Sequence, residues 1–306
     1  MTVNKKNFDV VIIGGGPGGL SAALVLGRAR KHVAVIDEGR PRNAVTHAGH
    51  GFLTRDGISP SEFRRIAKEE ISVYPSVSFV DDTAESITGS DGHFQITTSQ
   101  GIQLESKKVL FAVGMKDRPL PIPGLAEVYG RSAFVCPYCD GWELRDEPLV
   151  IINSGPELIH FAPVISGWSD RITFCTNGPD GLTDSERETL QRRVPLYDSP
   201  IRHIHSDDGI VREVVLEDGT SIPCRGIFFK PDLVMGSDLP HAIGCQLSEE
   251  GHVKVDAFGK TSVPGIFSAG DMTSRMHQKI IAAANGSAAA AALNNELNTE
   301  AWLKNG

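Results

Sequence analysis

The sequence predicts an α/β protein of two domains, on two observations. Its 306 residues exceed the roughly 100 to 200 residues of one typical domain. A strand, a glycine-rich turn and a helix follow one another at the start of the chain, in the order of a dinucleotide-binding unit. A composition of 40% hydrophobic and 22% charged residues supports a sizeable core and excludes a disordered or collagen-like chain.

The first strand is predicted over residues 8–13, a β-branched apolar run that ends at a glycine-rich turn. In that turn Gly14 permits a tight bend, Gly16 lets the backbone approach a pyrophosphate, and Gly19 lets the helix pack on the strand. The helix is predicted over residues 20–30, and the amides of its first turn suit phosphate groups. The turn therefore predicts a dinucleotide site, with a glycine-rich turn of no function as the alternative.

A second strand is predicted over residues 32–36 and ends at Asp37. This acid follows Gly19 at about the spacing at which a carboxylate accepts the ribose hydroxyls of a bound dinucleotide, near 20 residues. We therefore expect Asp37 to contact the ribose.

Charge and cysteine content narrow the partners and the compartment. The chain holds 30 Lys and Arg against 38 Asp and Glu, a net charge of −8, which argues against nucleic acid or an anionic membrane as the main partner. Of its five cysteines only Cys136 and Cys139 form a close pair, so no secreted disulfide framework is predicted. The apolar run at residues 10–15 is too short and too glycine-rich for a signal peptide or membrane span. We expect a cytoplasmic protein.

Near the C-terminus a short strand at residues 266–269 ends in Gly270 and Asp271, and His277 and Gln278 precede an alanine-rich helix that reaches Ala292. This segment resembles the second FAD motif of flavoproteins with two dinucleotide-binding domains. The resemblance implies that FAD is the cofactor, that Asp271 contacts its ribityl and phosphate part, and that Gln278 contacts the isoalloxazine.

A strand in the middle of the chain, over residues 109–114, resembles the Ala-Thr-Gly strand of the same flavoproteins. Val113 stands where that family usually has Thr, and Gly114 is retained. We include Gly14, Gly16, Gly19, Gly114 and Gly270 among the residues predicted to bind FAD.

The redox chemistry is predicted at Cys136 and Cys139, which stand three positions apart at the expected start of a helix. Thiols at this spacing can form a strained disulfide, and a helix start lowers the pKa of one thiol so that its thiolate can attack. Asp140 follows directly and is placed to take or give the proton. Two alternatives are a zinc site completed by His47 and His50, and a buried structural pair of cysteines. We predict no metal.

In their order along the chain, the glycine turn, the mid-chain strand, the Cys-Pro-Tyr-Cys-Asp-Gly segment and the Gly-Asp segment resemble low-molecular-weight thioredoxin reductase over essentially the whole length. The resemblance implies that Cys139 lies against the flavin, Cys136 exchanges with the substrate and Asp140 is the acid/base. It also implies a homodimer. Arg42, Asn43 and His50 are added to the predicted cofactor contacts.

The fold that this resemblance implies is an FAD-binding Rossmann-like domain with an inserted second, NAD(P)-binding-like α/β domain. We expect the FAD domain at residues 1–118 and 248–306 and the insert at residues 119–247, after a stiff proline-rich linker at residues 119–124. Inside the insert, residues 182–193 predict an exposed charged helix capped by Asp184 or Ser185.

The second nucleotide motif of the family is degraded in this sequence. The strand at residues 149–152 is present, but only Gly155 remains in the turn after it, Pro156 lacks an amide donor, and Glu157 adds negative charge. The next strand, at residues 171–175, is followed neither by an acid nor by an arginine cluster, so neither NAD nor NADP is specified.

With Arg42, Asn43, the segment 50–57 and Cys-Pro-Tyr-Cys, the sequence resembles an atypical branch of the family. Members of that branch are similar to dithiol oxidases that act on small dithiols, and to reductases that take electrons from ferredoxin or another flavin. We therefore predict an FAD-dependent thiol–disulfide oxidoreductase that uses NADPH poorly. Its expected substrate is a small dithiol or disulfide, or a thioredoxin-like protein. The alternatives are an NADPH-dependent thioredoxin reductase, an FAD redox sensor without turnover, and a structural zinc protein.

Overall fold

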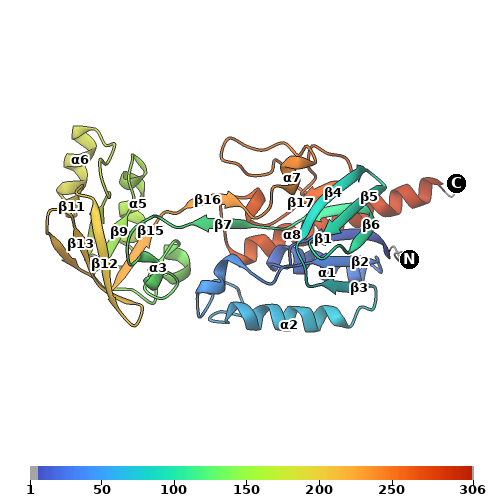
Figure 1. The fold of residues 1–306 in the computed structure, drawn as a ribbon, viewed down its shortest axis with the longest axis horizontal. Helices are drawn as coiled ribbons and strands as arrows, with labels where there is room; N and C mark the ends of the chain where they lie inside the picture. Colours follow the sequence, from blue (N-terminus) through green and yellow to red (C-terminus); the bar gives the residue numbers. More distant parts are fainter. Residues whose placement is uncertain (1–5, 305–306) are drawn as a thin grey trace. The chain divides into compact units, whose positions relative to one another are not determined.

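The computed structural model describes residues 6–304 and is an α/β fold, as predicted. Its contacts divide the chain into two units (Figure 1). The first consists of Met1–Ala44, Gly51–Lys116 and Leu233–Gly306, and the second of Val45–His50 and Asp117–Asp232. The domain boundaries expected at residues 118 and 247 stay a prediction.

The first unit is built on a seven-stranded sheet in the order β3-β2-β1-β6-β5-β4, with β17 also paired to β6. The pairs among β1, β2, β3, β6 and β17 are parallel, and those of β4 with β5 and β5 with β6 are antiparallel. The strands are β1 (Lys6–Ile13), β2 (Val33–Ile36), β3 (Val77–Val80), β4 (Ala84–Ser90), β5 (His93–Thr98), β6 (Gln103–Phe111) and β17 (Ile266–Ser268).

Both faces of this sheet are covered, which explains why its central strands read as continuous apolar runs. In β1, Val10 and Ile12 face a core shared with α1 and α8, whereas Val11 and Ile13 face a second core under the β4–β5 hairpin. The helices of the unit are α1 (Pro17–Arg28), α2 (Pro60–Ser72), α7 (Leu239–Ala242) and α8 (Lys279–Lys304), with 3-10 turns η1 (Arg42–Val45) and η2 (Asp271–Thr273).

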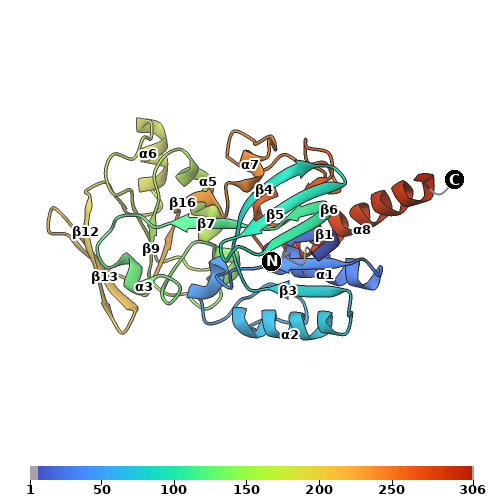
Figure 2. The same cartoon turned by 45° about the vertical axis from the view of Figure 1, so that its right-hand side comes forward.

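Helices α1 and α8 touch where both carry glycine. A Cβ on Gly286 would lie 1.9 Å from the carbonyl oxygen of Gly18, so this crossing admits no larger residue. Helix α8 runs to Lys304, twelve residues past the end at Ala292 that the alanine-rich stretch predicts. Its C-terminal part extends past the sheet of the first unit (Figures 1 and 2).

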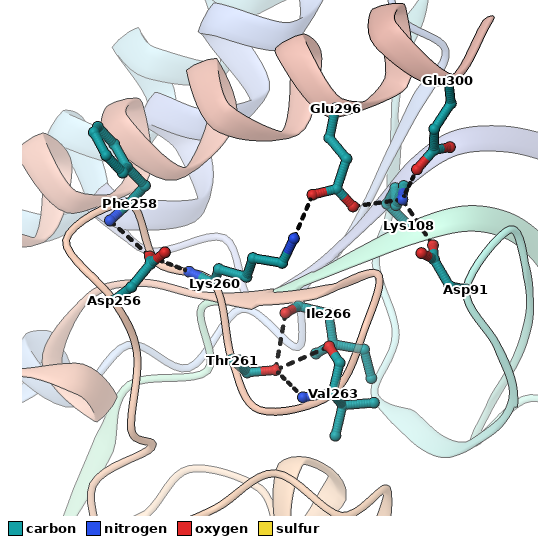
Figure 3. Close-up of polar contacts among 10 residues, drawn as sticks. All are labelled: Asp91, Lys108, Asp256, Phe258, Lys260, Thr261, Val263, Ile266, Glu296 and Glu300. Carbon is teal, nitrogen blue, oxygen red and sulfur yellow. Dashed lines mark hydrogen bonds and ion pairs between the residues drawn. The ribbon is translucent and has the colours of Figure 1, made fainter. Parts of the chain in front are cut away.

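A buried lysine holds the last turns of α8 (Figure 3). Lys108 of β6 has no exposed side-chain surface, and its Nζ donates to Asp91 at 2.7 Å, to Glu296 at 2.6 Å and to Glu300. Lys260 donates to the other oxygen of Glu296 at 2.8 Å. Burial opposes the ammonium, but the three carboxylates outweigh it and raise the pKa of Lys108. The prediction from the alanine-rich stretch missed these turns because a distant strand stabilises them.

The second unit has a five-stranded parallel sheet in the order β11-β10-β9-β15-β8 and a three-stranded antiparallel sheet β12-β13-β14. Its strands are β8 (Ala133–Phe134), β9 (Leu149–Ile152), β10 (Ile172–Cys175), β11 (Leu196–Tyr197), β12 (Ile201–Asp207), β13 (Ile210–Leu216), β14 (Ser221–Pro223) and β15 (Gly226–Phe229). Its helices are α3 (Leu125–Val128), α4 (Pro137–Asp140), α5 (Glu157–Ile165) and α6 (Asp184–Gln191).

Two paired strands, β7 (Met115–Arg118) and β16 (Asp232–Met235), carry the chain between the units. The charged helix expected in the second unit is α6, but its cap was predicted wrongly. Thr183 is the N-cap and forms a capping box with Glu186. The hydroxyl of Thr183 accepts a hydrogen bond from the Glu186 amide, and the carboxylate of Glu186 accepts one from the Thr183 amide. No helix within residues 6–304 has the length and apolar character needed to cross a membrane.

Candidate functional site

The first glycine turn joins β1 to α1 and is shaped by close backbone approach. Gly14 has a φ of +110°, and a Cβ there would lie 2.2 Å from the carbonyl oxygen of Ala112. A Cβ on Gly19 would lie 1.9 Å from the oxygen of Gly14, whereas Gly16 has no atom within 4 Å of its Cβ position. The turn is thus closed on the protein side and open at Gly16, which fits the pyrophosphate of a dinucleotide.

Asp37 follows β2 beside this turn. One of its carboxylate oxygens accepts from the Gly15 amide at 3.1 Å, and the other forms an ion pair with Arg64 of α2. The carboxylate that we expect at the ribose is therefore already held in place by two partners. Arg64 was missed from the sequence because nothing in α2 distinguishes it from the neighbouring Arg65.

The C-terminal Gly-Asp segment lies next to the same turn. The Cβ position of Gly18 is 3.6 Å from the Cα of Gly270, which has a φ of +85°. Asp271 begins η2, and its carboxylate is 3.8 Å from the guanidinium of Arg42. The structure thus brings together predicted FAD residues that are more than 200 positions apart in sequence.

The remaining predicted FAD contacts of the first unit flank these elements. Asn43 lies in η1 directly after Arg42. Gly114, with a φ of +65°, follows β6, and its oxygen accepts from the Gly236 amide at 2.9 Å. Gln278 directly precedes α8.

The cysteine pair lies in the second unit at α4. Cys136 is the N-cap of this single-turn helix and Cys139 lies within it, and both are half-buried. The amides of Cys139 and Asp140 donate to the oxygen of Cys136 at 3.1 and 3.2 Å. A hydrogen bond from the Cys139 thiol is the main cause that lowers the pKa of Cys136, against the opposing effect of burial.

Asp140 is the most perturbed acid of this segment. Burial first, and then the nearby charge of Glu143, raise its pKa to about 7, while His50 acts in the opposite direction. The Nε2 of His50 is 3.6 Å from a Glu143 oxygen. His50 was predicted as an FAD contact, and the structure places it in the second unit next to the residue that perturbs Asp140.

Two exposed aromatic rings are close to the pair in sequence. Tyr138 lies between the two cysteines with 67% of its surface exposed, and its ring meets Trp168 edge-on at 5.2 Å. Trp142 is 66% exposed, with the Arg145 guanidinium 4.3 Å from its ring centre. No sequence pattern singled out these rings, although Tyr138 and Trp142 stand within three positions of Cys139.

The other three cysteines differ from the pair. Burial raises the pKa of Cys175 and of Cys224 to about 12, and it also raises that of Cys245. Buried thiols of this kind are inert, whereas the lowered pKa of Cys136 favours reaction as a thiolate.

The zinc alternative receives no support from the part of the chain that is described. Within residues 6–304, the group of three or more potential metal ligands is Asp91, Glu296 and Glu300, and these carboxylates surround the Lys108 ammonium. Cys136 and Cys139 do not form such a group with His47 and His50.

The turn after β9 occupies the place of a second nucleotide site and differs from the first. The Gly155 amide donates to the carbonyl of Asp180 at 2.6 Å, so it is already used within the protein. Pro156 is the N-cap of α5, and Glu157 in the first turn pairs with Lys230. This turn offers few amides to a phosphate.

A dinucleotide turn and a half-buried Cys-x-x-Cys in one chain define the class of flavin-dependent disulfide oxidoreductases. The sequence profile of the pyridine nucleotide-disulphide oxidoreductase family matches residues 8–290, and the chain belongs to that family. The thioredoxin reductase aclD of Aspergillus oryzae is 30% identical over 303 residues, which cover 95% of this chain and 96% of the relative.

Two solved structures agree. A Bacillus anthracis structure designated thioredoxin reductase TrxB has a TM-score of 0.91 at 38% identity and covers 96% of this chain and 99% of that one. The structure of HlmI has a TM-score of 0.92 at 34% identity and covers 97% and 95%. The predicted fold, the resemblance to thioredoxin reductase, the FAD cofactor and the disulfide oxidoreductase activity are confirmed.

Proposed function

We propose that this FAD-dependent disulfide oxidoreductase works through Cys136 and Cys139, with Asp140 as the acid/base. The observation that carries the proposal is that the pKa of the Cys136 thiol is lowered while that of Asp140, whose charge acts on this thiol, is raised to about 7. A lowered thiol pKa favours the thiolate that attacks a disulfide, and an acid that titrates near neutral pH can hold or release the proton that the exchange moves.

The cysteines have different roles in this proposal. Cys136 exchanges with the substrate, because its pKa is lowered and the neighbouring Tyr138 is exposed to solvent. Cys139 completes the enzyme disulfide and passes electrons to FAD. When a substrate dithiol is oxidised, its two thiols become a disulfide, the enzyme disulfide becomes two thiols, and two electrons then pass to FAD.

The substrate class that we propose is a disulfide or dithiol, either small or carried by a thioredoxin-like protein. The relatives named thioredoxin reductases support the protein substrate. We further propose that the electron donor is ferredoxin or another flavin, or that oxygen is the acceptor in the oxidase direction. The occupied amide of Gly155 and the charge of Glu157 support a minor role for NADPH.

An anaerobic titration with dithiothreitol tests the cysteine pair. The flavin absorbance of the wild-type protein should bleach. In Cys139→Ser, this reduction of the flavin by dithiothreitol should be slower by about a thousandfold or more. Cys224→Ala is the matched control, because this buried thiol has no role in the proposal. The flavin of this variant should bleach like that of the wild type. Equal bleaching in Cys139→Ser and the wild type would refute the assignment.

A second candidate is an NADPH-dependent thioredoxin reductase, which the names of the relatives favour. Stopped-flow measurement separates the two candidates. Flavin reduction by NADPH at about 10 per second, the median turnover of enzymes, would favour the NADPH-dependent enzyme. A non-enzymatic redox sensor is the third possibility, and it predicts one flavin reduction without sustained consumption of oxygen or disulfide.

For assembly and location we propose a cytoplasmic homodimer, on the resemblance to thioredoxin reductases. Light scattering on the FAD-loaded protein measures the mass directly. A mass of one chain, about 33 kDa, would exclude the dimer.

A further inference from the structure

A histidine from a distant part of the sequence lies beside the turn that carries the cysteine pair. His50 ends the segment Val45–His50, which belongs to the second unit although the rest of that unit is Asp117–Asp232. The Nε2 of His50 is 3.6 Å from a carboxylate oxygen of Glu143. The side chain of His50 is 23% exposed and that of Glu143 is 44% exposed, so both groups reach solvent.

Glu143 lies near Asp140 on this turn. The two residues are three positions apart, which is the spacing of neighbours on a helical turn. Gly141 between them has helical backbone angles, with a φ of −71° and a ψ of −30°. A Cβ on Gly141 would lie 2.9 Å from the ring of Trp168, so the turn is closely packed at Gly141. The backbone therefore holds the carboxyl groups of Asp140 and Glu143 close to each other.

Electrostatic interactions connect these groups to the thiol that we propose to exchange with the substrate. Burial first, and then the charge of Glu143, raise the pKa of Asp140, and the charge of His50 opposes them. Within residues 6–304, Glu143 and His50 are the charged groups that act on this acid. The hydrogen bond from Cys139 is the main cause that lowers the pKa of Cys136, and the charge of Asp140 opposes it.

Thiol–disulfide exchange moves protons, and an acid that takes one has to release it before the next turnover. When the second thiol of a substrate attacks its mixed disulfide with Cys136, a substrate S–S bond forms, the mixed S–S bond breaks and the Cys136 thiolate leaves. The proton of the attacking thiol then passes to Asp140. Asp140 is half-buried, so a neighbouring group that reaches solvent can take this proton onward.

We propose that His50 carries the proton between Asp140 and solvent, and that Glu143 positions the ring of His50. Imidazole suits this role because it both takes up and releases protons near neutral pH. Contacts used in catalysis are often long in the free enzyme and shorten when substrate binds, which agrees with the 3.6 Å separation. The inference rests on the proposed role of Asp140 and the cysteine pair, and it replaces the expected contact of His50 with FAD.

Removal of the imidazole tests the proposal in the FAD-loaded protein. Anaerobic reduction of the flavin by dithiothreitol should be about ten- to a hundredfold slower in His50→Ala than in the wild type. This loss is smaller than the effect of a general acid or base at the reacting atoms, because His50 acts one transfer away. Free imidazole in the buffer should restore much of the lost rate, and sodium chloride at the same ionic strength should not.

The matched control is His160→Ala, because His160 is an exposed histidine on α5 of the same unit. Its flavin should be reduced at the wild-type rate with or without imidazole. A wild-type rate in His50→Ala would overturn the proposal and leave His50 and Glu143 as a surface ion pair. A slow rate that imidazole does not restore would also overturn it. A lower FAD content with an unchanged rate per bound flavin would assign His50 to FAD binding instead.

A conservative variant separates proton transfer from the shape of the side chain. His50→Gln keeps a polar group that can contact Glu143 but cannot carry a proton near neutral pH. It should therefore be as slow as His50→Ala, and it covers the case in which His50→Ala does not fold. A wild-type rate in His50→Gln would contradict the proposal.

The pH dependence of the rate tests the position of Glu143. Glu143→Gln removes a negative charge near Asp140, so the pKa of Asp140 should fall. The rate rises with pH as this acid ionises and can accept the proton, so the rising limb of the profile should move to lower pH. His50→Ala should move the same limb to higher pH. A limb that stays in place in both variants would overturn the proposal.

Cys139→Ser separates this inference from the proposed function. This variant should stay slow when imidazole is added, whereas His50→Ala should recover. Bleaching of Cys139→Ser at the wild-type rate would refute the assignment of the cysteine pair. A slow Cys139→Ser together with a His50→Ala that imidazole does not restore would refute only the role of His50.

Discussion

The two strand–turn–helix units of this chain start from similar sequences and end in different chemistry. After β1, a Cβ on Gly14 or Gly19 would lie about 2 Å from a backbone oxygen, so both positions require glycine. The turn is open at Gly16. After β9, Gly155 has no atom within 4 Å of its Cβ position, and its amide is bonded to Asp180. Both segments thus retain a parallel strand and a helix. Only the segment that begins with β1 retains a turn shaped for a pyrophosphate.

The comparison shows that the buried strand of a nucleotide-binding motif can be retained while the turn after it loses the residues that suit a phosphate. The apolar strand Leu149–Ile152 is buried throughout and contributes to the core of the second unit. The turn after it contributes little to packing, so changes such as Pro156 and Glu157 cost the fold little. The second unit instead carries the Cys136–Cys139 pair at α4.

The largest effect is expected from alanine at the glycines of the two turns. Gly14→Ala places a Cβ 2.2 Å from the Ala112 oxygen and should cost about 4 kcal/mol or more of unfolding free energy, with loss of FAD. Gly155→Ala meets no atom and carries only the strain of its positive φ, about 1–2 kcal/mol. Urea unfolding and the flavin content of the purified variants measure both. Similar losses in the two variants would remove the distinction between the turns.

The second prediction concerns the acid of the second unit. Asp140 ionises near pH 4 when unfolded and at about pH 7 when folded, so the wild-type protein loses stability as the pH rises from about 4 to 7. Asp140→Asn removes this cost and should gain on the order of 2–4 kcal/mol over the wild type at pH 8, and nearly nothing at pH 4. Urea unfolding at the two pH values measures the gain. A gain that is the same at both pH values would argue against the raised pKa.

A smaller effect is expected at the degraded turn. Glu157 lies in the first turn of α5, where its charge opposes a phosphate, and Lys230 offsets part of that charge. Glu157→Ala should raise the rate of flavin reduction by NADPH two- to fivefold, which corresponds to about 0.4–1 kcal/mol. Glu188→Ala on α6 is the control for a general change of charge. An increase of a hundredfold would show that this one residue, rather than the whole turn, limits NADPH.

The smallest effect is expected at the cysteines outside the pair. Because burial raises the pKa of Cys175 and Cys224 to about 12, they should react with a thiol reagent at pH 8 far more slowly than Cys136. Folded, reduced protein should therefore show rapid labelling of the pair alone, and all five thiols should react after unfolding. Mass spectrometry counts the labels, and rapid labelling of Cys224 would contradict its burial.

Local patterns were sufficient to predict the α/β fold class and the elements at which we propose that FAD binds and thiol–disulfide exchange takes place. The glycine turn, the buried strands and the Cys-x-x-Cys helix start are set by residues within about ten positions of one another. Pairings over long sequence distances could not be predicted in this way. The ion pair of Arg64 with Asp37, the contact of Arg42 with His277 and the placement of His50 near Glu143 all depend on tertiary contacts.

The buried Lys108 also bears on how this protein is made. Its partners Glu296 and Glu300 are synthesised about 190 residues later, and β17, the parallel neighbour of β6, also comes near the end of the chain. At roughly 5 to 20 residues per second, a ribosome needs about 10 to 40 s to supply them. Residues 117–232 emerge as one continuous stretch in the meantime, so we expect the second unit to fold first and the first unit to complete its sheet only after residues 266–300 have been synthesised.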